Sequence, residues 1–249
     1  MKRFFLALRF LTIWPFGSDG EVTAEDLAAS TVYYPLVGAI LGFVLYGFYT
    51  AAQRLWPMLA AAVLTVVLWE LLSAGLHLDG LMDTFDGLGV RGDRERRLAV
   101  MKDSRVGAFG VQAAVLSMLL KAAAVAGLAE RPAAGVLLLL SPVSGRTAMV
   151  VLMGTCRYAR DDAGLGKVFL EQTGTGRAVL AVVLALLIGV AAAGVRVFLP
   201  AAFLAVFFLL LRAFFQVNFG GVTGDILGAA CELHELAALL LAPLLFVEW

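Results

Sequence analysis

The sequence predicts an all-α integral membrane protein with about seven transmembrane helices and one N-terminal helix that is interfacial or re-entrant. The composition is the first reason. Of 249 residues, 61% are hydrophobic and 15% are charged, whereas a soluble domain has roughly 45–50% and 25%. The second is that apolar runs near the length that crosses a hydrocarbon core of about 30 Å recur along the chain. The third is the uneven placement of lysine and arginine between these runs.

The apolar runs define the predicted spans in chain order. They cover residues 31–52, 58–78, 108–129, 133–153, 178–194, 197–217 and 226–247. The fifth run is short and the seventh contains three titratable residues, so a count of six or eight also fits. Residues 1–16 combine basic residues with an apolar body, as a signal peptide does. Because Arg9 interrupts this body and no small-residue cleavage site follows, we expect an amphipathic helix that remains at the membrane surface.

The basic residues orient the predicted spans, because cytosolic connections carry an excess of lysine and arginine. With the N-terminus inside, thirteen of these residues lie in inside segments and three in outside segments. The inside residues are Lys2, Arg3, Arg9, Arg91, Arg94, Arg96, Arg97, Lys102, Arg105, Arg157, Arg160, Lys167 and Arg177. We therefore expect a multi-pass protein of the bacterial or archaeal cytoplasmic (inner) membrane, with cytosolic loops at 79–107 and 154–177 and an active site that faces the cytosol.

One membrane domain is expected over residues 1–249, because no low-complexity tract or linker divides the chain. Cys156 and Cys231 lack the spacing of a metal site or a disulfide framework and are interpreted as packing residues. The formal net charge is zero, so no overall basic character points to nucleic acid. The expected partners are membrane lipid and small-molecule substrates, with no nucleic acid.

Three aspartates at the cytosolic end of the second span carry the strongest chemical signal. Asp79, Asp83 and Asp86 are spaced i, i+4 and i+7, which places them within roughly 60° of one another on a helix. Carboxylates packed this closely repel one another unless a cation or protons lie among them. Such oxygen ligands suit Mg²⁺ that keeps waters and binds substrate phosphates. We predict that all three are catalytic and bind metal; the alternative is a solvated acidic helix end.

A second polar cluster precedes the third span. We expect Asp103 to begin this helix and to supply a fourth catalytic carboxylate and metal ligand, while Lys102 and Arg105 bind phosphate oxygens. The alternative for these two cations is a positive-inside flank. Lys121 lies deep in the span on the same helical face as Asp103, where a cation requires an acidic partner or an anionic ligand. Lys121 is therefore also a candidate for substrate binding.

Further candidates for substrate binding are cationic. Arg146 lies inside the apolar fourth span, and Arg157 returns eleven residues later to nearly the same helical face. An anionic partner is implied for Arg146, either a diphosphate or a neighbouring acid. Arg160 lies in a basic, glycine-containing segment, 158–167, that we expect to fold over a nucleotide. We also expect a hydrogen bond between Glu70 and His77, one heptad apart in the second span.

The last span carries acids at membrane depth. Asp225, Glu232 and Glu235 share one face of the predicted helix. Asp225 is predicted to bind substrate or metal, with helix capping as the alternative. Glu232 and Glu235 are alternative partners for Lys121 or Arg146.

Four motifs in this order resemble those of the cobalamin synthase family. They are Gly-Leu-His-Leu-Asp-Gly-Leu-Met-Asp-Thr-Phe-Asp-Gly at 75–87, Met-Lys-Asp-Ser-Arg-Val-Gly at 101–107, Tyr-Ala-Arg at 158–160 with Gly-Leu-Gly at 164–166, and Gly-Val-Thr-Gly-Asp-Ile-Leu-Gly-Ala at 221–229. The first string is highly specific. The resemblance covers nearly the whole chain.

The resemblance implies a Mg²⁺-dependent transferase of the late nucleotide-loop-assembly step of vitamin B12 biosynthesis. The expected substrates are adenosylcobinamide-GDP and alpha-ribazole, or alpha-ribazole 5'-phosphate. The expected products are adenosylcobalamin, or its 5'-phosphate, and GMP. The other enzymes of nucleotide-loop assembly are further candidate partners.

Two alternatives also use acids in a membrane. A CDP-alcohol phosphotransferase of lipid synthesis places Asp-Gly-x-x-Ala-Arg between its aspartates, whereas Asp79-Gly-Leu-Met-Asp-Thr lacks the Ala-Arg pair. A cation-coupled transporter would explain intramembrane acids, but no internal repeat of broken spans is visible.

Overall fold

The computed structural model describes residues 1–17, 21–130, 135–161 and 164–241. These residues form helices without any strand, apart from one isolated bridge between Tyr158 and Val222, so the all-α fold class is confirmed. The longer helices are α1 (Lys2–Leu11), α3 (Tyr34–Ala52), α4 (Met58–Leu72), α5 (Leu76–Gly89), α7 (Ala108–Gly127), α8 (Val136–Thr155), α9 (Leu165–Ala193), α10 (Phe198–Phe219) and α11 (Gly224–Leu240). Short helices α2 (Ala24–Ser30), η1 (Thr31–Tyr33), α6 (Arg94–Val100), η2 (Leu128–Glu130) and η4 (Gly194–Val197) connect them.

Four helical stretches of the described residues are long and apolar enough to cross a membrane. They are Ala24–Ala52, Ala108–Gly127, Val136–Thr155 and Leu165–Phe219. Helices α4 and α5 satisfy this test only as a pair that is bent by 90°. The predicted count of seven spans is therefore not confirmed. The predicted spans 178–194 and 197–217 fall within the single stretch Leu165–Phe219, and the span 226–247 extends beyond the described residues.

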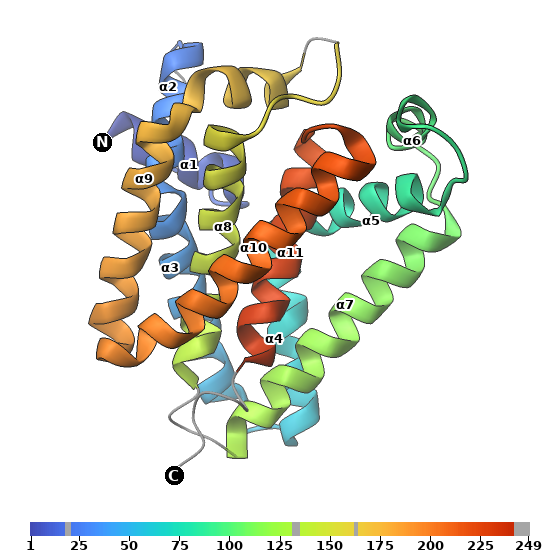
Figure 1. Cartoon of the computed structure of the whole chain (residues 1–249). Coiled ribbons are helices and arrows are strands. Elements are labelled where there is room, and N and C mark those ends of the chain that lie inside the picture. The colour runs from blue at the N-terminus through green and yellow to red at the C-terminus, as the bar shows by residue number, and fades with distance from the viewer. Residues whose placement is uncertain (18–20, 131–134, 162–163, 242–249) are drawn as a thin grey trace.

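The predicted span 58–78 is wrong in its second part, because the helix breaks after Leu72. Ala74 and Gly75 follow with φ of 54° and 66°, and two left-handed residues cannot continue a right-handed helix. Helix α5 then lies across the end of the bundle (Figure 1). The turn also removes the heptad on which the Glu70–His77 hydrogen bond was predicted. Both ring nitrogens of His77 are buried without a hydrogen-bond partner, so that prediction is wrong too.

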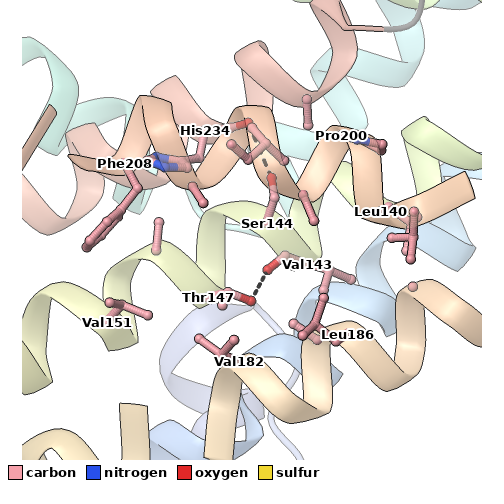
Figure 2. A pocket seen from close by; sticks show the side chains of 18 of the residues that line it. Leu140, Val143, Ser144, Thr147, Val151, Val182, Leu186, Pro200, Phe208 and His234 are labelled. Atoms are coloured by element: carbon pink, nitrogen blue, oxygen red, sulfur yellow. Dashed lines mark hydrogen bonds between the residues drawn. The ribbon is translucent and has the colours of Figure 1, made fainter. Parts of the chain in front are cut away.

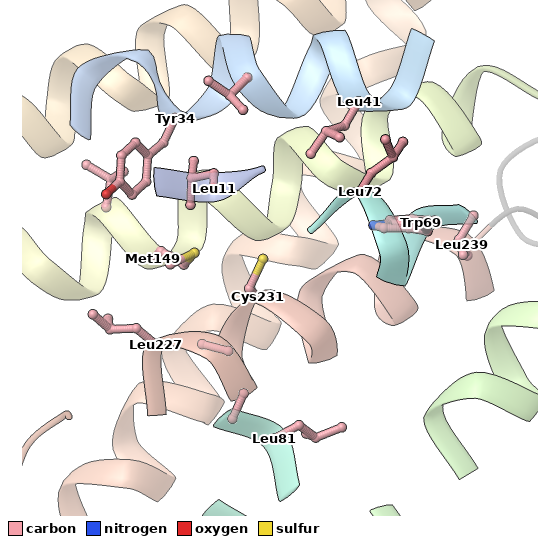
Figure 3. Packing of buried hydrophobic residues seen from close by; sticks show 14 of the residues in the cluster. Leu11, Tyr34, Leu41, Trp69, Leu72, Leu81, Met149, Leu227, Cys231 and Leu239 are labelled. Carbon is pink, nitrogen blue, oxygen red and sulfur yellow. The ribbon is translucent and has the colours of Figure 1, made fainter. Parts of the chain in front are cut away.

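Helix α8 packs closely against α3 because glycines face it. A Cβ atom on Gly38 would lie 2.5 Å from the carbonyl oxygen of Pro142, and one on Gly42 would collide with the backbone of Leu139. Small residues at this spacing let membrane helices approach closely. Around this contact, a hydrophobic cluster joins side chains from α1 to α11, including Leu11, Tyr34, Trp69, Met149 and Leu227 (Figure 3).

The connections with most of the basic residues gather at one end of the bundle. Figure 1 shows α1, α2, α5 and α6 at this end, together with the start of α9. Helix α1 has ten residues, which span about 15 Å and are too few to cross a membrane. It buries Ala7, Leu8 and Leu11 and exposes Arg3 and Arg9, as expected for an interfacial helix. We call this the basic end of the bundle.

Candidate active site

The three aspartates of the first motif lie on one helix, as predicted. Helix α5 contains Asp79, Asp83 and Asp86, so the i, i+4 and i+7 spacing places them on one side. Their surroundings differ along the helix. Asp79 is exposed, Asp83 is half-buried and Asp86 is buried. The helix therefore carries carboxylates from the surface of the basic end into the protein.

Glycines bring α11 against this helix. A Cβ atom on Gly80 would lie 2.6 Å from the carbonyl oxygen of Asp225, and one on Gly228 would lie 3.3 Å from the Cα atom of Gly80. No larger residue fits at either position without moving a backbone. Asp225 lies in the first turn of α11, but the cap is Thr223, whose side chain accepts a hydrogen bond from the Ile226 amide. The capping alternative for Asp225 is therefore wrong.

Asp79, Asp83, Asp86 and Asp225 form what we call the acidic group, and Arg160 is a cation that contacts it. Its Nη2 atom lies 2.9 Å from Oδ2 of Asp225. The segment that carries Arg160 is fixed to the start of α11: the Ala159 amide donates to the Val222 carbonyl over 2.9 Å. The Arg157 Nε atom also donates to the Gly220 carbonyl over 2.7 Å. Helix α8 ends at Thr155, so the predicted shared helical face of Arg146 and Arg157 does not exist.

The charges of the acidic group act most strongly on Asp83, which lies on α5, the helix that crosses the basic end after the 90° break. Burial, followed by the carboxylates of Asp225, Asp79 and Asp86, raises the pKa of Asp83 to about 6. Arg160 lowers it by less. Desolvation and like charges both disfavour a carboxylate. The four acids thus lie close enough for their charges to repel one another.

Asp86 has a contact that the sequence analysis did not predict. Its carboxylate accepts hydrogen bonds from the backbone amides of Gly107 and Gly110 over 2.7 Å and 2.8 Å. These amides lie at the N-terminus of α7, where backbone amides have no acceptor within the helix. A side chain at Gly107 or Gly110 would collide with this carboxylate. Asp86 thus joins α5 to α7, and two glycines make this contact possible: Gly107, which ends the second motif, and Gly110 in the first turn of α7.

Asp103 does not begin the third span. Helix α7 begins at Ala108 with Gly107 as its cap, so Asp103 lies in the preceding turn. Its carboxylate pairs with Arg105, whose Nη2 atom lies 2.6 Å from Oδ2, and this contact lowers the pKa of Asp103 to about 2. Both side chains are exposed, as is Lys102. The roles of Asp103, Lys102 and Arg105 in metal or phosphate binding stay predictions.

Comparison with known proteins decides the family. Residues 3–243 match the family model described as cobalamin-5-phosphate synthase. The chain belongs to this family. A relative from Pseudomonas syringae pv. syringae, named adenosylcobinamide-GDP ribazoletransferase, is 44% identical over 98% of this chain and 100% of its own length. Relatives of the same name from Pseudomonas fluorescens and Geotalea daltonii are 40% and 38% identical over 96% of this chain, and over 98% and 96% of their own lengths. No solved structure matches the chain.

Membership in the cobalamin-5-phosphate synthase family makes this chain a membrane transferase of cobalamin synthesis. It decides against both alternatives from the sequence, the CDP-alcohol phosphotransferase and the cation-coupled transporter. The resemblance identified from the four motifs is confirmed.

This cobalamin-5-phosphate synthase family member has a second set of acids inside the bundle. Lys121 is fully buried, and its Nζ atom lies 2.8 Å from Glu232, 2.8 Å from Glu235 and 3.2 Å from Glu70. Arg146, also fully buried, forms an ion pair with Glu235. The acidic partners that the sequence left open are therefore present for both cations. Glu70, which was predicted to bond to His77, is instead a partner of Lys121, a contact that no pattern in the sequence indicated.

An apolar cavity of about 360 Å³ lies between α8, α9, α10 and α11 (Figure 2). Ser144, Thr147 and His234 are polar groups in its lining. Both hydroxyls donate to backbone carbonyls, and Nδ1 of His234 lies 2.9 Å from the Ala230 carbonyl. No member of the acidic group lines this cavity. It is therefore separate from the candidate active site.

The acidic group fits a hydrated metal ion better than an enclosed one. No three or more His, Cys, Asp or Glu side chains among the described residues are arranged to hold a metal ion by themselves. Mg²⁺ usually keeps several waters and takes one or two carboxylates together with substrate phosphates. Asp79, Asp83 and Asp225 supply such carboxylates, since Asp86 is already bonded to α7. A Mg²⁺ site here would require the substrate to complete it.

Proposed function

We propose that this protein transfers the adenosylcobinamide-phosphate group from adenosylcobinamide-GDP to alpha-ribazole or alpha-ribazole 5'-phosphate. A ribose hydroxyl of the acceptor attacks the phosphorus attached to the corrinoid side chain, and GMP leaves. The products are adenosylcobalamin, or its 5'-phosphate, and GMP. The names of the relatives support the donor substrate, since they are adenosylcobinamide-GDP ribazoletransferases.

One observation carries the proposal: four carboxylates converge at the basic end, and Arg160 forms an ion pair with one of them, Asp225. Asp79, Asp83 and Asp225 remain available for a divalent cation, and Asp86 fixes α5 against α7. The excess negative charge disfavours a bare diphosphate and favours a diphosphate that arrives with a cation. When bound, Mg²⁺ would neutralise charge that develops on the phosphate oxygens.

Basic side chains of the protein bind the diphosphate oxygens that the metal ion does not contact. Arg160 is placed beside Asp225 by the bridge between Tyr158 and Val222, and a guanidinium suits phosphate oxygens because it donates two parallel hydrogen bonds. Lys102 and Arg105 lie in the turn before α7, next to the amides that hold Asp86. We assign these three cations to the diphosphate and leave Lys121 and Arg146 to their buried acids.

We also propose that the basic end faces the cytosol in the bacterial or archaeal inner membrane. The excess of basic residues at this end supports the orientation. A cysteine at Gly92 should resist an impermeant thiol reagent in intact cells and react after lysis. Labelling before lysis would place the site on the wrong side for a cytosolic nucleotide donor.

The decisive experiment measures GMP release by the purified protein in liposomes. We expect release that requires adenosylcobinamide-GDP, an acceptor riboside and Mg²⁺, with loss after EDTA and recovery after Mg²⁺ is restored. A corrinoid product of the expected mass should form in equal amount. Release of GMP without this product, or full activity in EDTA, would contradict the transfer or its metal requirement respectively.

A further inference from the structure

A second cavity opens directly beside the acidic group. It has a volume of about 540 Å³ and lies between the end of α1 and the break that separates α4 from α5. Asp79 lines it together with Arg9, Phe10, Leu76 and Met82. A carboxylate of the candidate active site, a guanidinium and apolar side chains therefore share one cavity.

The walls of this cavity are fixed by contacts that use most of its polar groups. The Ile13 amide donates to the Leu72 carbonyl over 2.9 Å, which fixes the end of α1 against the end of α4. The Thr12 hydroxyl donates to the Leu8 carbonyl, and the Ser73 hydroxyl donates to the Trp69 carbonyl. These hydroxyls have little capacity left for a ligand. The charged groups Arg9 and Asp79 are then the main polar groups that a ligand would meet.

The aromatic wall is also held in place. The ring of Phe10 lies 5.1 Å from that of Phe169 and 6.3 Å from that of Tyr34. Such ring contacts fix an aromatic side chain in one orientation. Phe10 therefore gives the cavity a rigid apolar surface on the side of α1, opposite the apolar side chains of α5.

The size and the lining of this cavity fit the riboside acceptor better than the corrinoid donor. A cavity of this volume is typical for a drug-sized ligand, and a whole corrinoid is far larger. The guanine of the donor would bury several polar atoms against apolar side chains, which costs free energy for each unpaired atom. A benzimidazole base has an apolar ring and needs few polar partners. A riboside with an apolar base and a phosphate on its ribose matches apolar walls with a guanidinium among them.

We propose that this cavity binds the acceptor as alpha-ribazole 5'-phosphate, with its ring against Phe10 and its phosphate on Arg9, which makes Arg9 a specificity-determining residue. This inference rests on the proposed function, because it presumes that a riboside is the acceptor. A guanidinium carries five N–H donors, so Arg9 can bind a phosphate and keep a protein contact. Asp79 then lies at the ribose end of the acceptor, toward Asp83 and Asp225.

The test compares two acceptors, alpha-ribazole 5'-phosphate and alpha-ribazole, in the GMP-release assay with the full-length protein in liposomes. Arg9→Gln should lower kcat/KM for the phosphorylated acceptor about ten- to a hundredfold. It should change kcat/KM for the free riboside less than about threefold. Arg9→Lys should restore part of the preference, because it keeps the charge but loses the guanidinium geometry. Arg3→Gln, on the exposed side of the same helix, is the control and should leave both values unchanged.

A second variant tests the cavity itself. Met82→Trp fills space beside Asp79 and should raise KM for both acceptors about tenfold, without changing the dissociation constant of adenosylcobinamide-GDP. Equal losses for both acceptors in Arg9→Gln, or weaker donor binding in Met82→Trp, would overturn the assignment. An unchanged acceptor preference in Arg9→Gln would also overturn it and would leave Arg9 to lipid headgroups. Wild-type protein that releases no GMP with either acceptor would instead reject the proposed function.

Discussion

Two groups of acids in this protein have similar composition and opposite surroundings. At the basic end, Asp79, Asp83, Asp86 and Asp225 lie near Arg160, and their exposure decreases from the exposed Asp79 to the buried Asp86. Inside the bundle, three glutamates contact Lys121 and Arg146, and both cations are fully buried. The first group has unbalanced charge and an opening to solvent. The second is nearly balanced and closed to solvent.

The difference teaches how the surroundings decide the role of an acid. A buried carboxylate must be paired, because an isolated charge in a membrane is very costly. In the inner group, which consists of Glu70, Glu232, Glu235, Lys121 and Arg146, the acids and the cations form ion pairs with one another. These pairs hold α4, α7, α8 and α11 together. The outer group, which is the acidic group at the basic end, has more negative than positive charge. A divalent cation that arrives with the substrate can neutralise the excess. Predictions that separate activity from stability test this distinction.

The largest expected effect is on activity at the outer group. Asp83→Asn keeps the size of the side chain and removes its charge, so GMP release should fall about 1,000-fold, equivalent to about 4 kcal/mol. Thermal stability at neutral pH should not fall and should increase, because the substitution removes a carboxylate whose ionised form is disfavoured in the folded protein. The measurement is kcat/KM at limiting and saturating Mg²⁺, with Glu95→Gln as an exposed control at the same end. Wild-type turnover at limiting Mg²⁺ would rule out the metal role. A comparable loss in Asp103→Asn would support the predicted fourth ligand.

The next effect is on stability at the inner group. Lys121→Met leaves three glutamates with one cation, which should destabilise the fold by about 3–5 kcal/mol. Thermal unfolding in detergent measures this. Adding Glu232→Gln should recover part of the loss, because it removes one uncompensated charge. If Lys121→Met kept its stability and lost GMP release, Lys121 would belong with the substrate, as the sequence analysis proposed.

A smaller effect is expected at Arg160. Its replacement in Arg160→Gln should lower kcat/KM about ten- to a hundredfold, because a charge-assisted contact to phosphate is worth roughly 1.5–3 kcal/mol. The double variant with Asp225→Asn separates two explanations. If Arg160 only neutralises Asp225, Arg160→Gln should cause no further loss in protein that already carries Asp225→Asn. If Arg160 binds the diphosphate, Arg160→Gln should cause the same ten- to a hundredfold loss in that background. Steady-state kinetics with adenosylcobinamide-GDP measures both.

The smallest effect concerns pH. The pKa of Asp83 is raised from 3.8 to about 6, so the folded protein binds this proton more tightly than the unfolded chain does. Stability from this group is present below pH 4 and decreases as the pH rises to about 6. Metal binding requires the ionised form, so the apparent affinity for Mg²⁺ should weaken about fivefold from pH 6 to pH 5. Mg²⁺ titrations of GMP release at pH 5, 6 and 7 measure this, and a flat profile would contradict it.

Local patterns in the sequence predicted the outer group better than the inner one. The helix that carries Asp79, Asp83 and Asp86 follows from spacing within a single segment. For Lys121, the sequence offered Glu232 and Glu235 only as one alternative beside substrate binding, and it gave no sign of the contact with Glu70. Short-range features were also misread where the backbone turns. The 90° break at Ala74 and Gly75 lies in an apolar run, and the turn at Asp103 precedes a helix that begins at Ala108.

The sequence by itself determined the membrane character, the all-α class, the family and the aspartate helix, because these depend on composition, periodicity and contiguous motifs. Only the tertiary structure decided which charges meet. Gly80 and Gly228 allow α11 to bring Asp225 beside α5, Gly107 and Gly110 occupy Asp86, and helix packing pairs Lys121 and Arg146 with glutamates. Electrostatic energy depends on distance and burial in space, and neither quantity can be read from positions along a chain.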